Sequence, residues 1–363
     1  MVPEPPEPGN GNTKRRPTLH DVAQIAGVDL STASRLLRNH TANYRPETRD
    51  RVLAAAAELG YRTNPQARAL RTGRQHAIAM LVPDLDNFGF TQVLRGAQQV
   101  CDERGFTLLI SEVSARPGLI DRRPMGLENR VDGMLVAFAS ADDPQLGEWL
   151  DGLGMPVVIV QRGTPDAEAS VLFDEEANAA AMVDFLVGLG HRRIGHLSGS
   201  LHTDTGIRRR RGFERAARQH GLEISDEWLV EGGWSIPSGR DAATRLIEKA
   251  QTSPTALAVD SLVEAIGALS ALRDLGVRVP DDMSVIAIDE HLVAAHTTPS
   301  LTTVRLDQRE LGRQAAAMLL DRIDGLPGSR MIVPSPAEII ARESTSPPRD
   351  RSPVTQPNSS ASR

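Results

Sequence analysis

LHDVAQIAGVDLSTASR, residues 19–35, is the stretch that decides the fold of the N-terminal part of the chain. Apolar residues recur at helical spacing on both sides of Gly27, which predicts two short helices joined by a turn. Gly27 can adopt the left-handed conformation that a tight turn needs, and Ala26 is small where two helices approach. Asp29 and Ser31 can cap the second helix. The second helix would have a size that fits the major groove of B-DNA.

A third helix is predicted next, because Val52, Ala56 and Leu59 keep the helical spacing. Pro46 suits its first turn and Gly60 its end. This part of the chain is basic: residues 13–75 hold 12 Lys and Arg against 5 Asp and Glu, a net charge of +7. The whole chain carries −6 and the first twelve residues −2, so residues 76–363 carry −11. A basic head on an acidic body indicates a polyanionic partner for the head.

Composition excludes several classes of protein. The 363 residues are 40% hydrophobic and include one cysteine, Cys101, which leaves no internal disulfide and no cysteine-rich metal site. The longest apolar runs fall far short of the roughly 20 residues of a membrane-spanning helix. The N-terminus has neither a basic start nor an apolar stretch, so no secretory signal or lipid anchor is expected. We therefore expect a cytoplasmic protein without membrane contact.

The remainder of the chain predicts an α/β body between two tails. From His76 onward, short β-branched runs alternate with amphipathic stretches, which is typical of βαβ organisation. Roughly 260 residues are enough for two α/β lobes with a ligand cleft between them. The first residues and those from Ser344 hold almost nothing apolar, and both tails are expected to be disordered. The predicted division is a tail (1–17), a helix–turn–helix domain (18–63), a hinge helix with linker (64–75), the two-lobed domain (76–343) and a second tail (344–363).

From Thr18 to about Arg342 the chain resembles the lactose-repressor (LacI/GalR-type) family of bacterial transcription regulators. The helix–turn–helix carries the resemblance together with RPETRDRV (45–52), ELGYRTNP (58–65), QARALRTG (66–73), LVPD (81–84), GLGHRRI (188–194), RRRGF (209–213), SVIAID (284–289) and TPSLTTV (298–304). The resemblance implies an all-α helix–turn–helix DNA-binding head plus hinge helix, followed by an α/β two-lobed periplasmic-binding-protein-like effector domain.

The resemblance also implies the DNA-binding residues. Leu30, Ser31 and Arg35 occupy the base-reading places, and the guanidinium of Arg35 can bond both acceptors of a guanine. Phosphate contacts are expected from Thr18, Ser34, Tyr61 and Asn64. Thr32, Ala67 and Leu70 complete the set, and Leu70 matches the leucine with which the family's paired hinge helices open a central base step in the minor groove.

The effector site is implied in the same way. A polyhydroxylated ligand needs carboxylate acceptors, a guanidinium and an aromatic face. The positions that match the family supply these groups as Arg209, Asp289 and Trp234, with Asn87 and Phe90 on the opposite wall. Asp174 is a weaker candidate near the surface between the lobes.

The sequence departs from the family at five places. The loop after the recognition helix, residues 38–44, is one residue longer, and Asp29 replaces a serine, which should cost some non-specific DNA affinity. NFGF at residues 87–90 differs from the common Asn-Pro-Phe-Phe, Gln161 stands where an aspartate is common, and residues 260–267 are spaced differently from the usual Asn-Asp segment. These last three departures predict a non-standard effector site.

The leading hypothesis is therefore a homodimeric, sequence-specific repressor that binds a pseudo-palindromic operator in double-stranded DNA. A small molecule, a sugar or a sugar derivative, would control it allosterically. The alternative is a sugar-binding protein of a transport system without DNA function, against which the basic head and the missing export signal argue. An enzyme is not expected, because nucleophile-elbow, phosphate-loop and zinc-protease motifs are missing. No cofactor is implied, and His191 and His196 are expected to be structural rather than metal ligands.

Overall fold

The computed structural model describes residues 17–37, 44–61, 73–113, 115–116, 119–120, 126–127, 129–138, 146–164 and 167–349. The chain divides into two compact units, residues 1–75 and 76–363. Each unit has its own apolar core.

The first unit is a bundle of three short helices, as the apolar spacing predicted: α1 (Leu19–Ala26), α2 (Leu30–Leu36) and α3 (Pro46–Leu59). Gly27 and Gly60 end α1 and α3 in the left-handed conformation, with φ of 62° and 60°. Asp29 caps α2, and Pro46 begins α3. The buried core consists of Val22, Ala23, Ala26, Ala33, Leu36, Val52, Ala55 and Ala56. Because most of these side chains are small, the helices can lie close together.

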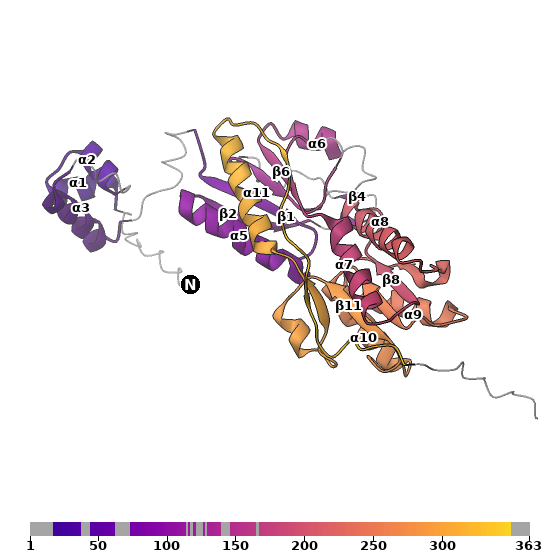
Figure 1. Cartoon of the computed structure of the whole chain (residues 1–363). Coiled ribbons are helices and arrows are strands. Elements are labelled where there is room, and N and C mark those ends of the chain that lie inside the picture. The colour runs from indigo at the N-terminus through magenta and orange to yellow at the C-terminus, as the bar shows by residue number, and fades with distance from the viewer. Residues whose placement is uncertain are drawn as a thin grey trace, which may run out of the picture. The chain divides into compact units, whose positions relative to one another are not determined.

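The second unit has two lobes, each built on a six-stranded sheet (Figure 1). The first sheet is parallel and has the order β13 (Arg330–Ile332), β7 (Ser170–Leu172), β6 (Val157–Val160), β5 (Met134–Val136), β1 (Ala77–Val82) and β2 (Thr107–Glu112). The helices of this first lobe are α5 (Phe88–Arg104), α6 (Leu146–Gly152) and α11 (Gln308–Ile323). A short pair, β3 (Ala115–Arg116) with β4 (Leu119–Ile120), forms a separate two-stranded sheet.

The second lobe is built in the same way. Its sheet has the order β14 (Glu338–Ile340), β12 (Thr302–Arg305), β11 (Ser284–Ile288), β10 (Ala256–Val259), β8 (Ile194–Ser198) and β9 (Leu229–Glu231), with β14 antiparallel. Its helices are α7 (Glu175–Gly188), α8 (Asp204–Gln219), α9 (Ile236–Lys249) and α10 (Leu262–Asp274), with 3₁₀ turns at Asp226–Trp228 and Leu292–His296. The chain passes between the lobes after β7, after β12 and after β13.

The helices of both lobes pack in pairs that touch through glycine. In the first lobe, α5 and α11 lie side by side on the sheet (Figure 1). A Cβ atom on Gly312 would lie 2.0 Å from the carbonyl oxygen of Val93, and one on Gly96 would lie 2.0 Å from that of Arg309. Gly239 and Gly267 bring α9 and α10 together in the same way. These backbones are so close that no side chain fits between them.

The C-terminal segment corrects one predicted boundary. Ser344 was expected to begin a disordered tail, but it is fully buried. Its hydroxyl donates to the carbonyl of Val285 at 2.6 Å, and its amide donates to the carbonyl of Ser300 at 2.9 Å. Ser346 continues the contact, because its carbonyl lies 2.9 Å from Nε2 of His191. Polar composition concealed this because the segment is held by hydrogen bonds rather than by apolar burial.

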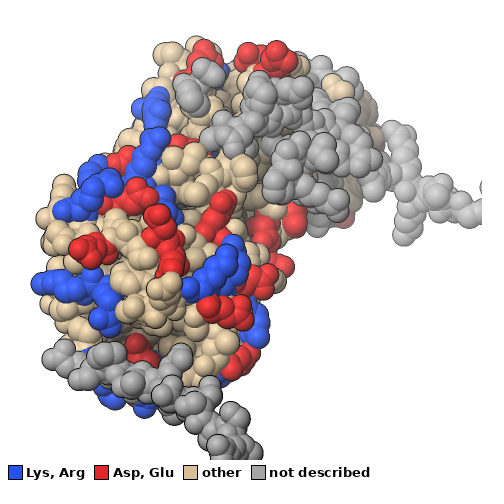
Figure 2. All heavy atoms as spheres, turned by 90° about the vertical axis from the view of Figure 1, so that its right-hand side faces the viewer, with Lys and Arg blue, Asp and Glu red and all other residues tan. Residues whose placement is uncertain are grey.

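The surface of the second unit carries both signs of charge. Figure 2 shows Lys and Arg interleaved with Asp and Glu over the face that it draws. Several are paired, for example Arg278 with Asp282 at 2.7 Å and Arg240 with Asp274 at 2.8 Å. Of the helices that the structure describes, none is long and apolar enough to cross a membrane.

The glycine contacts generate a stability prediction. We expect Gly312→Ala to lower the free energy of unfolding by about 1–3 kcal/mol, because the new methyl group would overlap the backbone of Val93. Equilibrium unfolding in urea measures this. Gly188→Ala at the end of α7 is the control, since no atom lies within 4 Å of the added carbon, and its stability should be unchanged or slightly higher. Equal losses in the two variants would contradict the packing argument.

Candidate functional site

The turn of the first unit is held by side-chain caps at both of its helices. At α1, the amide and hydroxyl of Thr18 both donate to the carboxylate of Asp21, at 2.7 and 2.8 Å, and the amide of Asp21 donates to the Thr18 hydroxyl at 3.4 Å. Thr18 therefore has a structural role in addition to its predicted phosphate contact.

Asp29 organises the start of α2. Its carboxylate accepts the amide of Thr32 at 2.8 Å and the hydroxyls of Ser31 and Thr32, both at 2.6 Å. The hydrogen bonds from Ser31 and then from Thr32 hold the pKa of the Asp29 carboxyl well below its ordinary value. A negative charge is thus maintained at the N-terminal end of α2, beside the predicted base-reading residues Leu30 and Ser31. The helix dipole also favours a negative charge there.

The outer surface of α2 carries the predicted base-reading residues. Leu30, Ser31 and Arg35 are exposed, Leu30 by 49%, whereas Ala33 and Leu36 are buried. The guanidinium of Arg35 donates to the hydroxyl of Tyr44 at 3.4 Å. The structure therefore places an apolar, a hydroxyl and a guanidinium group together on one accessible short helix.

The other predicted DNA-binding residues divide into two groups. Thr32, Ser34 and Tyr61 are half-buried, and burial raises the pKa of the Tyr61 phenol. Asn64, Ala67 and Leu70 of the hinge lie outside the described residues, as does most of the longer loop at 38–43.

In the second unit, polar side chains from both lobes meet. We call six of them the inter-lobe cluster: Arg162, Glu175, Arg209, Trp234, Asp260 and Asp289. Arg162 follows β6 of the first lobe, and the others come from α7, α8 and the segments after β9, β10 and β11 of the second lobe. Ligands of open parallel sheets bind outside the carboxyl ends of the strands, which is where Arg162, Asp260 and Asp289 lie.

Arg209 is the centre of the cluster. It is 1% exposed, its Nε donates to Oε2 of Glu175 at 2.6 Å, and its guanidinium also donates to the carbonyl of Asp260. Its Cζ lies 5.7 Å from the centre of the Trp234 ring. Burial lowers the pKa of Arg209, but the nearby carboxylates of Glu175 and Asp289 outweigh it and raise the pKa above its ordinary value. Arg209 is therefore always charged.

Backbone strain marks both walls of the cluster. Gln161 and Asp289 adopt the left-handed region, with φ of 67° and 80°, at the ends of β6 and β11. Such strain in residues other than glycine gathers at functional sites. Oδ1 of Asp289 accepts from Nε2 of Gln308 at 2.7 Å. Burial raises the pKa of the Asp289 carboxyl, and the charge of Arg209 partly opposes that rise.

A second buried network adjoins the cluster and was not predicted from the sequence. Nε2 of His196 lies 2.8 Å from Oδ1 of Asp260, and its ring stacks on Phe213 at 4.4 Å. Glu264 accepts the amide of Gly233 at 3.0 Å and the hydroxyl of its own cap residue Ser261. Burial, and then the charge of Asp260, raise the pKa of Glu264 well above its ordinary value. The unusual spacing of residues 260–267 was the only sequence signal for this network.

The remaining predicted effector residues have structural partners of their own. Asn87 caps α5 by accepting the amide of Gly89 at 3.0 Å. Phe90 is 3% exposed and belongs to the apolar core, so packing accounts for its burial. Asp174 caps α7. For all three, contact with a ligand stays a prediction.

Several buried polar atoms around the cluster have no hydrogen-bond partner in the part of the chain that the structure describes. They are Gln161 Oε1, Glu175 Oε1, Asn178 Nδ2, His196 Nδ1, Ser198 Oγ, Arg209 Nη2, Trp234 Nε1 and Gln308 Oε1. Buried polar atoms are normally paired, so a concentration of unpaired donors and acceptors indicates a site for a polar molecule.

The two lobes touch on both sides of the cluster. Phe88 of the first lobe stacks on His291 of the second, with ring centres 4.8 Å apart. The amide of Gly163 donates to Asp204 at 3.0 Å, and the hydroxyl of Thr205 donates to the carbonyl of Gln161 at 3.2 Å. These contacts hold the two lobes together near the cluster.

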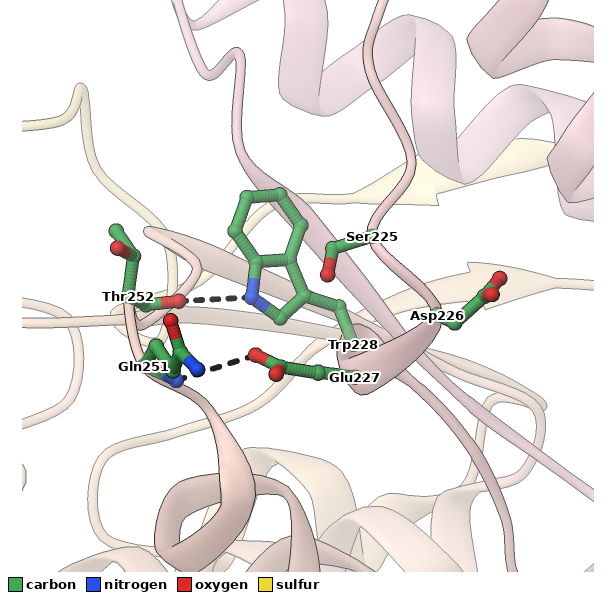
Figure 3. A pocket seen from close by; sticks show the side chains of 6 residues that line it. All are labelled: Ser225, Asp226, Glu227, Trp228, Gln251 and Thr252. Carbon is green, nitrogen blue, oxygen red and sulfur yellow. Dashed lines mark hydrogen bonds between the residues drawn. The ribbon is translucent and has the colours of Figure 1, made fainter.

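A surface hollow elsewhere in the second lobe has a different character. Figure 3 shows its lining, Ser225, Asp226, Glu227, Trp228, Gln251 and Thr252. The indole of Trp228 donates to the carbonyl of Thr252 at 2.7 Å, and the backbone amide of Gln251 donates to the carboxylate of Glu227 at 3.1 Å. These groups satisfy one another, so the hollow offers a ligand less than the cluster does. No group of three or more potential metal ligands comes together in the described parts of the chain.

Comparison with known proteins shows similarity over both units. The model of the lacI family of bacterial regulatory proteins matches residues 18–64, and the model of the periplasmic binding protein-like domain matches residues 183–345. The HTH-type transcriptional repressor PurR of Serratia proteamaculans is 32% identical over 90% of this chain and 96% of its own length, and that of Vibrio vulnificus is 31% identical over 90% and 98%.

Solved structures agree with this. The complex of the transcriptional regulator CelR with cellobiose has a TM-score of 0.68 and 30% identity, covering 91% of this chain and all of that one. The lac repressor dimer bound to operator and the anti-inducer ONPF has a TM-score of 0.76 and 26% identity, covering 92% of this chain and all of that one.

The buried ion pair of the cluster can be tested directly. We expect Glu175→Gln to lower the free energy of unfolding by about 3 kcal/mol or more, because Arg209 would remain buried without its counter-ion. Glu176→Gln is the matched control, since the neighbouring pair of Glu176 with Arg215 is largely exposed and should contribute less than about 1 kcal/mol. Urea unfolding of both variants gives the comparison, and similar losses would refute the central place of the buried pair.

Proposed function

Since this chain belongs to the LacI family of DNA-binding transcriptional repressors, we propose that it binds a pseudo-palindromic operator as a homodimer and that a small molecule in the inter-lobe cluster controls this binding. Its relatives match both the head and the body, which favours a regulator over a free-standing transport protein. Binding to bacterial chromosomal DNA requires a cytoplasmic location, which is part of the proposal.

The exposed face of α2 is the observation that carries the DNA-binding part. Arg35 can donate to both acceptors of a guanine in the major groove, a contact worth roughly 1–3 kcal/mol of discrimination. Leu30 offers an apolar contact of the kind that suits a thymine methyl group. Thr18, Ser34 and Tyr61 would contact phosphates, which position the head without reading sequence.

Dimerisation follows from the size of the head. One small three-helix head presents little surface, and two heads on a symmetric duplex gain affinity through their effective concentration. The lac repressor neighbour is described as a dimer bound to operator. In the hinge, Asn64, Ala67 and Leu70 would lie at the minor groove, with Leu70 as the wedge at the central step.

The inter-lobe cluster supports the effector part. Its carboxylates accept from hydroxyl groups, its guanidiniums donate to oxygen atoms, and Trp234 offers a flat apolar face, which together suit a sugar or sugar derivative. The CelR neighbour is described in complex with cellobiose. Because the cluster is built from both lobes, a ligand changes their closure, and closure changes the spacing of the two hinges.

Selection of bound sequences from random duplex DNA tests the operator proposal. We expect a site with two-fold symmetry, and Arg35→Ala should lose the preference at one base pair in each half-site. Arg51→Ala is the control, because it removes an exposed positive charge from α3 and should weaken all sequences alike. An enriched site without symmetry would overturn the dimer, and an unchanged base preference in Arg35→Ala would remove Arg35 from the reading role.

Asp29 gives a second prediction. Asp29→Asn keeps a residue that caps helices well and removes a negative charge near the DNA phosphates. We expect its affinity for random-sequence duplex to rise by about threefold or more at low salt, with the gain shrinking between about 50 and 200 mM salt. Fluorescence anisotropy measures both. Asp29→Ser is also neutral and can also cap the helix, so it should show the same gain in affinity. Affinities equal to that of the native protein at both salt concentrations would contradict the electrostatic role.

A further inference from the structure

The inter-lobe cluster contains a guanidinium that has no counter-ion among the described residues. Arg162 is 6% exposed, yet its guanidinium makes no hydrogen bond or ion pair with any residue that the structure describes. Its recorded neighbour is the ring of Trp234, whose centre is 5.5 Å from Cζ. Burial, and then the like charge of Arg209, lower the pKa of Arg162 to about 10, so it stays charged at neutral pH. A buried cation of this kind is costly unless something compensates it.

Other buried or partly buried arginines of the second unit show what is missing. Arg209 has Glu175 at 2.6 Å, and Arg342 has Glu290 at 2.7 Å. Arg208 is paired with Asp204 at 2.9 Å. In the sequence, Gln161 stands immediately before Arg162. Arg162 therefore has the burial of a paired arginine without the partner.

Two more donors at this place have no acceptor among the described residues, and one of them belongs to the Trp234 indole itself. Nη2 of Arg209 and Nε1 of Trp234 are buried and unpartnered. Cζ of Arg209 lies 5.7 Å from the ring that Arg162 approaches to 5.5 Å. One oxyanion has enough lone pairs to accept from several such donors, and guanidiniums bind carboxylate and phosphate by preference.

Each nearby carboxylate is hydrogen-bonded to a group other than Arg162, and Oδ1 of Asp289 accepts from Gln308 at 2.7 Å. Oε2 of Glu175 is bonded to Arg209, and both oxygens of Asp260 are occupied, by His196 at 2.8 Å and by the amide of Gly199 at 2.9 Å. Glu264 accepts the amide of Gly233 at 3.0 Å and the hydroxyl of Ser261 at 2.8 Å, and burial raises its pKa. The unpartnered acceptors that remain, on Gln161, Glu175 and Gln308, suit hydroxyl donors of a ligand.

We propose that the effector is a hydroxylated organic oxyanion, a sugar phosphate or a sugar acid, whose anionic group binds Arg162 together with the free donors of Arg209 and Trp234. This rests on the proposed function, since it specifies the ligand of the same cluster. A neutral sugar would leave Arg162 without a counter-ion. Arg162 is then the residue that selects charged over neutral ligands.

Matched probes test the ligand class on the full-length protein. Thermal unfolding is followed with sodium phosphate, sodium acetate, glucose, galactose, their 6-phosphates and their aldonic acids, with sodium chloride equalising ionic strength. We expect an anionic probe to raise the unfolding temperature, with an affinity at least about tenfold above that of its neutral parent. Stabilisation confined to phosphate and the phosphorylated sugars assigns a phosphate ligand, and stabilisation confined to acetate and the aldonic acids assigns a carboxylate.

The stability of the ligand-free Arg162→Gln variant tests the proposal without any probe molecule. If Arg162 serves an anionic ligand, the free variant should be at least as stable in urea as the native protein, because an unpaired buried charge has been removed. Its affinity for the stabilising anion should also fall about tenfold. Arg162→Lys should retain part of that affinity. A free Arg162→Gln protein that is clearly less stable assigns Arg162 a structural role and overturns the proposal.

The outcomes separate this inference from the proposed function. If no anion stabilises beyond sodium chloride, the oxyanion class is overturned. Should a neutral sugar then stabilise the native protein and Arg162→Gln equally, and Trp234→Ala abolish the effect, the cluster remains the effector site. If neither neutral nor anionic probes stabilise, the effector site of the proposed function fails as well, while the operator selection still tests the head by itself.

Discussion

The buried contact between Arg209 and Glu175 is the interaction on which the second unit depends most. It joins the first turn of α7 to α8, and the same guanidinium reaches the carbonyl of Asp260 after β10 and the ring of Trp234 after β9. Four elements of one lobe are thereby held around one charge. Burying that charge is expensive unless every partner is in place, so the pair makes the arrangement all-or-none rather than adjustable.

The same physics supports the junction between the lobes as the proposed site of control. Each sheet has an apolar core, but the strand ends that meet between the lobes carry charges, strained residues and unpaired polar atoms. In the structure, several buried donors and acceptors at the junction have no partner among the described residues. The proposed ligand would stabilise the arrangement in which it satisfies them, since only such differential binding can move a conformational equilibrium.

The head shows a compromise of another kind. Asp29 caps α2 and binds the hydroxyls of Ser31 and Thr32, which orders the start of the helix proposed to read DNA. It does so by keeping a negative charge on a surface that, under the proposed function, approaches phosphates. The structure confirms the predicted cap, which depends on residue type at one position, whereas the electrostatic cost stays a prediction. Sequence reasoning did not foresee that Asp29 would engage the hydroxyl of Ser31, a predicted base-reading residue.

The sequence by itself determined what local pattern can encode: three helices with their caps, the alternation of strands and helices, and the residue types of a family-like site. It missed the attachment of Ser344 and the roles of Glu175, Arg162 and the His196–Asp260 contact. The physical reason is the separation along the sequence over which each interaction acts. Periodicity and caps act over a few residues, whereas Glu175 and Arg209, or His196 and Asp260, are brought together only by folding. Whether a charged side chain finds a partner, as Arg209 does and Arg162 does not, was therefore decided by the tertiary structure alone.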